Sequence, residues 1–251
     1  MARRSGCGWV LLLVSVLWLI PGSVSAQERL NAAVAANFIQ AFTEISQAFE
    51  RKTGVKVEAT FASTGSLYGQ IANGAPYDLF LSADEDRPGH LNREGAGERP
   101  FVYARGRCVL WSARKDFCRA RDWRTALRGD EVKRVAIANP ETAPYGTAAR
   151  TALVQTGLWE ALKQKWVFAQ NIAQAFQYAS TSATEAGFCA YSSVMSDEGK
   201  KGCFYRIEEA PAIVQSACIL KRTPHRASAE AFAAFLASPE ADAIKARYGY
   251  R

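Results

Sequence analysis

Apolar positions along the first part of the chain change from a strand period to a helical period and back. Residues 30–35 form an apolar run of strand length, and residues 38–49 carry Phe or Ile one helical turn apart. That helix is expected to end at Gly54, because glycine readily takes the left-handed conformation that follows a last helical turn. Residues 55–59 then alternate apolar and polar side chains as a second strand. The order strand, helix, strand predicts an α/β fold with parallel strands.

Small hydroxyl residues follow the second strand, in the sequence STGS at 63–66, where the apolar period becomes helical again. The first N–H groups of a helix have no partner within it, and the positive end of the helix dipole lies there, so an anion is favoured. Ser and Thr add donors without adding charge. An ordinary N-cap, which needs no ligand, explains the same residues. The helix is broken at 73–76, and residues 77–83 are expected to form a short buried strand.

The second half of the chain repeats the order of strand, loop and helix, without a sequence repeat or a low-complexity linker. Its expected strands are residues 101–104, 108–111, 135–138, 166–169, 187–191 and 213–220. Its expected helices are residues 122–127, 148–154, 170–178, 227–237 and a last segment that ends near 250. The first two of these strands are either a pair or a segment that crosses between the halves. The pattern predicts two α/β halves joined by two crossing strands, with the terminal helices packed on the first half.

Three turns between a strand and a helix are expected at the carboxyl edges of the sheets, where open α/β folds bind ligands. Asn37 follows the first strand, and residues 63–64 follow the second. The turn-rich loop 139–147 opens a helix in the second half and places Tyr145 directly before Gly146. Asn37 is either a helix cap or an amide donor to an anion. Tyr145 either packs on the loop or offers its amide or its hydroxyl.

The first 26 residues have the three parts of a secretory signal peptide: Arg3 and Arg4, an apolar run at 9–20, and small residues that end at Ala26. We expect cleavage after Ala26, which also removes Cys7. An uncleaved anchor is the alternative, although the apolar run is short for a membrane span. Cleavage removes two arginines and no acidic residues, so the formal charge falls from +7 to +5 over 225 residues. Because basic residues are scattered and no basic run alternates with aromatic residues, we do not expect nucleic-acid binding.

The expected mature chain contains five cysteines: Cys108, Cys118, Cys189, Cys203 and Cys218. An odd number in an oxidising compartment leaves at least one free thiol or an intermolecular bond. Cys189 and Cys218 lie in apolar runs and are expected in the core, whereas Cys108 and Cys118 are near enough in sequence to close a small loop. The connectivity stays open. No pair has C-x-x-C spacing and only two histidines are present, so a zinc site is not expected.

Five segments carry a resemblance to a known family. They are AANF at 35–38, TGVKVEATFASTGSLYGQI at 53–71, GAPYDLFLSAD at 74–84, NPETAPYG at 139–146 and FLASPEADAIKARYGY at 235–250. In order and spacing, the chain resembles the periplasmic molybdate-binding proteins of ABC transporters, over essentially the whole mature chain. The resemblance implies the two-lobed, type II periplasmic-binding-protein fold, with two mixed, mainly parallel sheets joined by two crossing strands. We expect residues 27–107 and 219–251 to form lobe 1, and residues 108–218 to form lobe 2.

Position by position, the resemblance implies four residues that bind a tetrahedral oxyanion: Asn37, Thr64, Tyr145 and Ile172. Thr64 matches a ligand serine of the family, and Ile172 matches an apolar residue that offers only its backbone N–H. The backbone of Ala36 and the hydroxyl of Ser63 are weaker candidates. For Tyr145, the choice between amide and hydroxyl stays open.

Many family members also donate a tyrosine hydroxyl from the strand that corresponds to residues 188–191. That position aligns here with Ala190, and Tyr191 follows one residue later. A shift of one residue along a strand turns a side chain to the other face, so we do not include either residue. Whether Tyr191 approaches the ligand stays open.

All of these candidates are neutral donors, and this decides between ligands. A fully deprotonated tetrahedral dianion requires only donors, and converging N–H and O–H groups hold it without a buried counter-charge. Hydrogen phosphate needs an acceptor for its proton, and Glu141 is the one acidic residue within the candidate loops. Molybdate or tungstate is therefore favoured, bound through these same residues without a separate metal ion or cofactor. Sulfate is the nearest competitor, followed by phosphate.

We expect a periplasmic monomer that delivers its oxyanion to the membrane permease of an ABC transporter. A secreted enzyme is the main alternative, but the chain has no G-x-S-x-G motif, and His90 and His225 lie in polar surroundings. A sensing or adhesion module on the same fold is a third class. The residues therefore favour a binding protein without catalytic activity.

Overall fold

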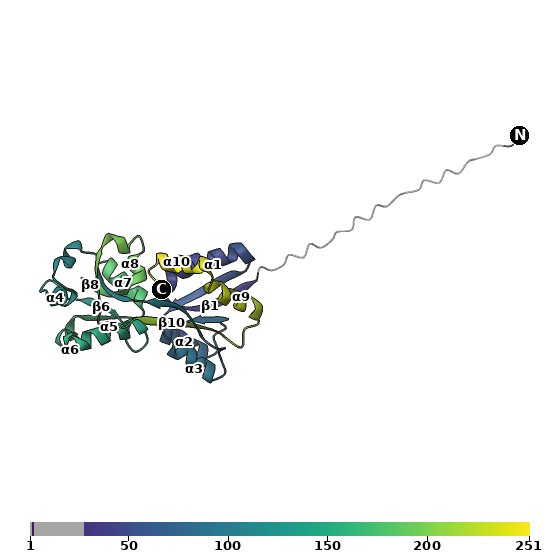
Figure 1. The fold of residues 1–251 in the computed structure, drawn as a ribbon, viewed down its shortest axis with the longest axis horizontal. Coiled ribbons are helices and arrows are strands. Elements are labelled where there is room, and N and C mark those ends of the chain that lie inside the picture. The colour runs from purple at the N-terminus through teal and green to yellow at the C-terminus, as the bar shows by residue number, and fades with distance from the viewer. Residues whose placement is uncertain (1, 3–27) are drawn as a thin grey trace.

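The computed structural model describes residue 2 and residues 28–251, and the expected signal peptide, with Cys7 and the cleavage site after Ala26, otherwise lies outside these residues. The described chain forms two α/β lobes, each built on a sheet of five strands (Figure 1). Both sheets are mixed, as expected, but parallel and antiparallel pairings are equally frequent in each of them. Within residues 28–251, no helix combines the length and the apolar character needed to cross a membrane.

The sheet of the first lobe has the strand order β2-β1-β3-β10-β4. Its strands are β1 (Arg29–Ala35), β2 (Lys56–Ala62), β3 (Leu79–Leu81), β4 (Phe101–Gly106) and β10 (Ile213–Ile219). β1 pairs in parallel with both β2 and β3, whereas β10 runs antiparallel between β3 and β4. The turns that follow β1 and β2 therefore lie at the same edge of the sheet.

Helices cover both faces of this sheet (Figure 1). They are α1 (Ile39–Thr53), which follows a 3₁₀ turn at Ala36–Phe38, α2 (Thr64–Ala72), α3 (Asp86–Arg93), α9 (Arg226–Leu236) and α10 (Pro239–Arg247). α1 ends as expected at Gly54, which has a φ of 76°. Its buried aromatic stripe packs in one core with α9 and α10, while α2 and α3 form a smaller core on the opposite face.

The sheet of the second lobe has the strand order β7-β6-β8-β5-β9. Its strands are β5 (Cys108–Ser112), β6 (Val135–Ala138), β7 (Trp166–Ala169), β8 (Ala186–Ala190) and β9 (Cys203–Arg206). Its helices are α4 (Trp123–Arg128), α5 (Pro144–Gln155), α6 (Leu158–Ala161), α7 (Ile172–Ser180) and α8 (Tyr191–Val194). Shorter 3₁₀ turns lie at Lys115–Arg119, Lys163–Lys165 and Gly199–Lys201. β6 runs parallel to β7 and β8, so this lobe also directs several strand-to-helix turns to one edge.

Two segments connect the lobes. β4 continues into β5 through Arg107 alone, although the two strands belong to different sheets, so the crossing is confirmed and the alternative of a strand pair is wrong. The chain returns from β9 to β10 through residues 207–212. The lobe boundary expected at residue 218 stays a prediction, but β10 pairs with the first sheet from Ile213 onward.

Some element bounds differ from the apolar pattern. α5 begins at Pro144 rather than at residue 148, because proline suits the first position of a helix, and Tyr145 therefore lies in the first turn. The strand expected to reach residue 191 ends at Ala190, and Tyr191 begins α8. The edge strand β9 was not predicted, because its apolar run, residues 203–205, is only three residues long.

One disulfide joins Cys118 to Cys203, so the suggested loop between Cys108 and Cys118 is wrong. Cys118 lies in the 3₁₀ turn that contacts the edge strand β9. Cys108 instead faces the core from the inner strand β5, where burial raises the pKa of its thiol to about 12. Cys189 and Cys218 are buried free thiols, as expected of core residues.

Candidate functional site

A small cavity, which we call the interlobe cavity, lies between the two lobes at the ends of β1, β2 and β6. All six residues expected at the ligand site line it: Ala36, Asn37, Ser63, Thr64, Tyr145 and Ile172. The first four belong to the first lobe and the last two to the second. The cavity volume is about 10 Å³, which leaves room for about one water molecule. A larger ligand therefore requires the lobes to part.

Ser63 and Thr64 begin α2 with different roles. Ser63 is the N-cap: its Oγ accepts the N–H of Ser66 at 3.3 Å and lies 2.7 Å from the Oγ of Ser66. The Oγ1 of Thr64 accepts the N–H of Ala83 at 3.0 Å. This bond orients the Thr64 hydroxyl and leaves its own proton for a ligand. Of the two hydroxyls, Thr64 is therefore the better oriented donor.

The start of α5 has no side-chain cap. Its N-cap residue is Ala143, and Pro144 at the first position has no N–H. The N–H groups of Tyr145 and Gly146 are therefore the first of the helix, with the positive end of the dipole behind them. A Cβ on Gly146 would lie 2.1 Å from the carbonyl oxygen of Ala138, so only glycine permits the helix to start this close to the end of β6.

The start of α7 supplies one further backbone donor to the interlobe cavity. Asn171 is the N-cap, and its Oδ1 accepts the N–H of Gln174 at 3.0 Å. Ile172 is the first residue of the helix, and its side chain is buried in the core of the second lobe. Because that side chain has no polar atom, only the N–H of Ile172 can serve a ligand.

Asn37 lies in the 3₁₀ turn before α1, and its side chain is buried. Its Nδ2 donates to Oε1 of Gln215 at 2.7 Å and to the hydroxyl of Tyr250 at 3.1 Å. Its Oδ1 has no hydrogen-bond partner, although it is buried. A buried polar atom without a partner is uncommon and calls for an explanation.

Behind Asn37 lies a buried polar network that the sequence did not predict. Gln215 on β10 is at its centre: its Oε1 also faces the hydroxyl of Tyr103 at 3.0 Å, and its Nε2 donates to the hydroxyl of Tyr145 at 3.3 Å. The hydroxyls of Ser192 and Tyr250 both donate to the backbone carbonyl of Asn37, at 2.9 and 2.6 Å. The one available signal was a glutamine inside the apolar run at 213–219.

The interlobe cavity and its network are uncharged at neutral pH. None of the described residues that line the cavity carries an ionisable carboxylate, amine or guanidinium group. Burial raises the pKa of Tyr103 and of Tyr145 well above the usual phenol value, and that of Tyr250 to about 12. All three phenols therefore keep their protons and remain donors.

The lobes meet directly beside the interlobe cavity. The N–H of Gly65 donates to the carbonyl of Thr142 at 2.8 Å, and the guanidinium of Arg87 donates to the carbonyl of Glu141 at 3.4 Å. The side chain of Glu141 is exposed and pairs with Arg150 at 3.1 Å. The acidic residue of the candidate loops therefore points to solvent and offers the cavity no acceptor.

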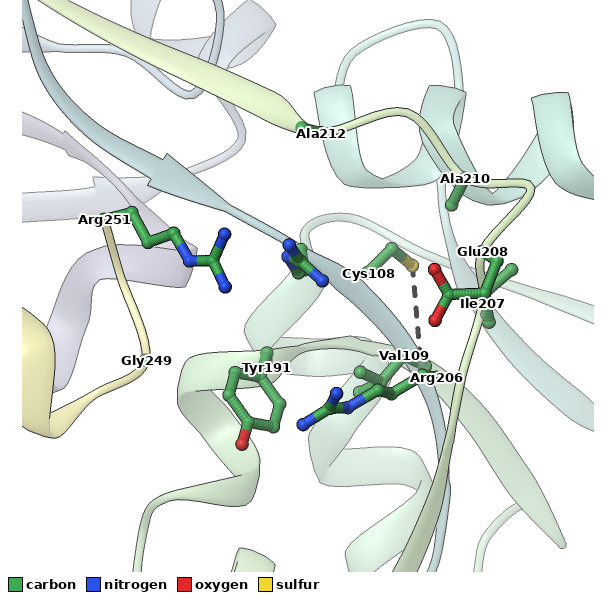
Figure 2. Close-up of a pocket in the computed structure, with 11 residues that line it drawn as sticks. Cys108, Val109, Tyr191, Arg206, Ile207, Glu208, Ala210, Ala212, Gly249 and Arg251 are labelled. Atoms are coloured by element: carbon green, nitrogen blue, oxygen red, sulfur yellow. Dashed lines mark hydrogen bonds between the residues drawn. The ribbon is translucent and has the colours of Figure 1, made fainter.

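Tyr191 lines a different cavity. This second cavity has a volume of about 280 Å³ and lies where both crossing segments and the C-terminal residues meet (Figure 2). Figure 2 shows Tyr191 beside the side chains of Arg206 and Arg251. None of the six expected site residues lines the second cavity. Tyr191 is therefore not among the residues that surround the interlobe cavity.

Residues 28–251 contain no group of three or more His, Cys, Asp or Glu side chains that could hold a metal ion. The residues that line the interlobe cavity come from two lobes, and apart from the side-chain oxygen of Asn37 their free polar groups are N–H and O–H donors. Such a set binds an anion by hydrogen bonds and provides no nucleophile with an adjacent base.

The model of the family described as bacterial extracellular solute-binding protein matches residues 30–251. Two relatives are each 41% identical to this chain over 228 residues. The molybdate-binding protein ModA of Azotobacter vinelandii aligns with 88% of this chain and 89% of its own length. The molybdate-binding protein ModA of Rhodobacter capsulatus aligns with 90% of this chain and 89% of its own length.

The solved structures include a periplasmic molybdate-binding protein of Azotobacter vinelandii. It superposes on this chain with a TM-score of 0.82 at 34% sequence identity, and the alignment covers 88% of this chain and 98% of that chain. The similarity therefore extends over both lobes.

Proposed function

Since the chain belongs to the bacterial extracellular solute-binding proteins, we propose that it captures molybdate or tungstate between its lobes and delivers the anion to an ABC importer. It is a binding protein rather than an enzyme, and it uses no cofactor. Two relatives at 41% identity are molybdate-binding proteins, which supports this choice of oxyanion.

The observation that carries the proposal is the neutral donor set of the interlobe cavity. A dianion buried among several N–H and O–H groups exchanges its water shell for fixed hydrogen bonds and needs no counter-charge. Two helix starts, those of α5 and α7, add the positive ends of their dipoles. With Glu141 turned to solvent, no carboxylate is present to accept the proton of hydrogen phosphate. The donor set therefore favours a fully deprotonated anion.

We assign four donors to the oxyanion. Thr64 donates its hydroxyl, Tyr145 and Ile172 donate their backbone N–H groups, and Asn37 donates its side-chain amide. The backbone of Ala36 and the hydroxyl of Ser63 remain secondary candidates. The hydroxyl of Ser63 is already engaged with Ser66 at 2.7 Å, which supports this ranking.

The partner we propose is the membrane permease of an ABC transporter, and the location is the periplasm. The Azotobacter vinelandii structure is that of a periplasmic protein, and residues 1–26 have the composition of a cleaved signal peptide. We propose that the mature protein works as a monomer and has no nucleic-acid partner. Size-exclusion chromatography with light scattering tests the monomer, and a mass twice that of the chain would contradict it.

Calorimetric titration of the mature protein with molybdate, tungstate, sulfate and phosphate tests the ligand. We expect one molybdate or tungstate per chain, weaker sulfate binding and no hydrolytic turnover. Tight phosphate or sulfate binding without a response to molybdate would overturn the proposal.

Small-angle scattering tests the mechanism of capture. The donors belong to both lobes, so a ligand that bridges them draws the lobes together. We expect a smaller radius of gyration with molybdate than without it. Identical scattering curves in the two states would contradict capture by closure.

A further inference from the structure

We propose that Gln215 is a positioning residue that sets which end of the Asn37 amide faces the interlobe cavity, and so selects an oxyanion that carries no proton. This inference rests on the proposed function of the interlobe cavity. Neither Gln215 on β10 nor Tyr103 on β4 lines that cavity, so they reach it through residues that do: Gln215 contacts Asn37 and Tyr145, and Tyr103 contacts Gln215.

With the side-chain amides of Asn37 and Gln215 oriented as in the structure, two hydrogen-bonding requirements are not met. The first is the buried Oδ1 of Asn37, which has no partner. Because Nδ2 faces Gln215 and Tyr250, Oδ1 is the amide atom left for the cavity that Asn37 lines. The second conflict is at Tyr103, whose single proton faces two acceptors: the carbonyl of Ser82 at 3.1 Å and Oε1 of Gln215 at 3.0 Å.

A 180° rotation of the side-chain amides of Asn37 and Gln215 removes both conflicts without moving another heavy atom. The Nε2 of Gln215 then donates to Oδ1 of Asn37 and to the oxygen of Tyr103, across the same contacts of 2.7 and 3.0 Å. Tyr103 gives its one proton to Ser82, and Tyr145 donates to Oε1 of Gln215 across 3.3 Å. The exchange gives up the amide bond to Tyr250 at 3.1 Å, which is the longer of the two that Asn37 makes, and it turns the proton of Tyr145 from the hydroxyl of Tyr250 to Gln215. Amide oxygen and nitrogen have the same shape, so hydrogen-bond accounting decides between the arrangements.

The backbone carbonyl of Ser82, directly after β3, decides the direction of these hydrogen bonds, because a carbonyl oxygen can only accept. Tyr103 must donate to it, and the oxygen of Tyr103 is then an acceptor for Gln215. Gln215 in turn directs its NH₂ to Tyr103 and Asn37. The chain of bonds from Ser82 therefore ends with the NH₂ of Asn37 facing the interlobe cavity.

This orientation selects between anions. A free NH₂ donates to a proton-free dianion, whereas the opposite orientation presents an oxygen that repels the dianion and accepts the proton of hydrogen phosphate. The network thus discriminates without a charged side chain. It also joins the lobes, because Gln215 lies in the first lobe and Tyr145 in the second.

A double-mutant cycle for molybdate affinity tests the inference, with Tyr103→Phe and Asn37→Ala made singly and together. Tyr103→Phe removes the acceptor that holds Gln215, so we expect about tenfold weaker molybdate binding in the parent background. In the Asn37→Ala background, the same substitution should change the affinity less than about twofold, because the proposed effect of Tyr103 on the ligand passes through that amide. Tyr205→Phe is the matched control. The hydroxyl of Tyr205 donates to the carbonyl of Ala120 at 2.8 Å in the second lobe, away from the cavity, so its loss should change neither affinity.

The outcomes separate the inference from the proposed function. If the parent protein does not bind molybdate, the proposed function fails. If it binds molybdate and Tyr103→Phe weakens binding equally in both backgrounds, or in neither, the inference alone is overturned. Gln215→Met replaces Tyr103→Phe in the cycle if that variant does not fold.

Gln215→Glu supplies an independent readout. Burial raises the pKa of the introduced carboxyl, so the titration is made at a pH above that value, where the carboxylate only accepts. It then holds the NH₂ of Asn37 and turns Oδ1 to the cavity. We expect the ratio of molybdate to phosphate affinity to fall at least tenfold relative to Gln215→Met. Equal losses for both anions would mean simple charge repulsion and would contradict the inference.

Discussion

Replacing Thr64 with Ala removes the hydroxyl of a residue that is 1% exposed and lines the interlobe cavity. Its oxygen accepts the N–H of Ala83 at 3.0 Å, so its proton is the part available to a ligand. A hydrogen bond to a charged group contributes about 1.5–3 kcal/mol, and water has little room to replace it here. We therefore expect Thr64→Ala to bind molybdate about ten- to hundredfold more weakly.

The same substitution also affects the folded chain. The N–H of Ala83 loses its partner in a buried position, which lowers the free energy of unfolding by about 1–3 kcal/mol. Calorimetry gives the affinity, and urea unfolding without ligand gives the stability. Thr64→Ser keeps the hydroxyl and should restore most of both quantities.

Ser63→Ala distinguishes the neighbouring hydroxyl. It removes the N-cap of α2 and should cost about 1 kcal/mol of stability with little loss of affinity. The assignment of Thr64 would be refuted if Thr64→Ala bound molybdate like the parent while Ser63→Ala did not.

Three further substitutions have defined outcomes. Tyr145→Phe should lower stability by about 1 kcal/mol and affinity less than about tenfold, because the hydroxyl bonds Gln215 while the backbone N–H stays in place; a hundredfold loss by calorimetry would make the phenol the donor. Ile172→Val should leave affinity within about twofold, because only the N–H is used, and its cost of about 0.5–1.5 kcal/mol appears in urea unfolding. Cys203→Ser should lower the free energy of unfolding by about 2–5 kcal/mol, because it opens a link between residues 85 positions apart. Its molybdate affinity should stay unchanged, and a large loss would mean that the disulfide supports the site.

The sequence was most informative where one element shows its own period. The stripe from Phe38 to Phe49, the cap at Gly54 and the hydroxyl start of α2 are local features, and the structure has each of them. The fold class followed from the order of such elements. Local periodicity was enough because each signal depends on residues only a few positions apart.

Contacts between distant residues could not be predicted in the same way. Cys118 pairs with Cys203 because β9 lies at the sheet edge beside the 3₁₀ turn, and no spacing rule shows this. Proline moved the start of α5 upstream to Pro144, which brought the N–H of Tyr145 into the first helical turn. A turn-rich sequence alone does not show which of its residues is the first in the helix.

The candidate site shows the same limit. The expected residues lie on three helix starts and one 3₁₀ turn, which the order of elements places at sheet edges. Gln215 is separated from Asn37 by 178 positions, and its role depends on which acceptor its amide faces. That choice depends on the hydrogen bonds of Tyr103 and Ser82, which only a folded chain defines.

The central claim is that a proton-free oxyanion lies between neutral donors of the two lobes. Diffraction from crystals grown with molybdate, recorded at the molybdenum absorption edge, locates the metal atom directly. We predict one anomalous peak per chain in the interlobe cavity. The oxygens of the molybdate centred on this peak should lie within hydrogen-bonding distance of the Thr64 hydroxyl and of the N–H groups of Tyr145 and Ile172. A peak in the second cavity beside Arg206 and Arg251, with the interlobe cavity empty, would contradict the account.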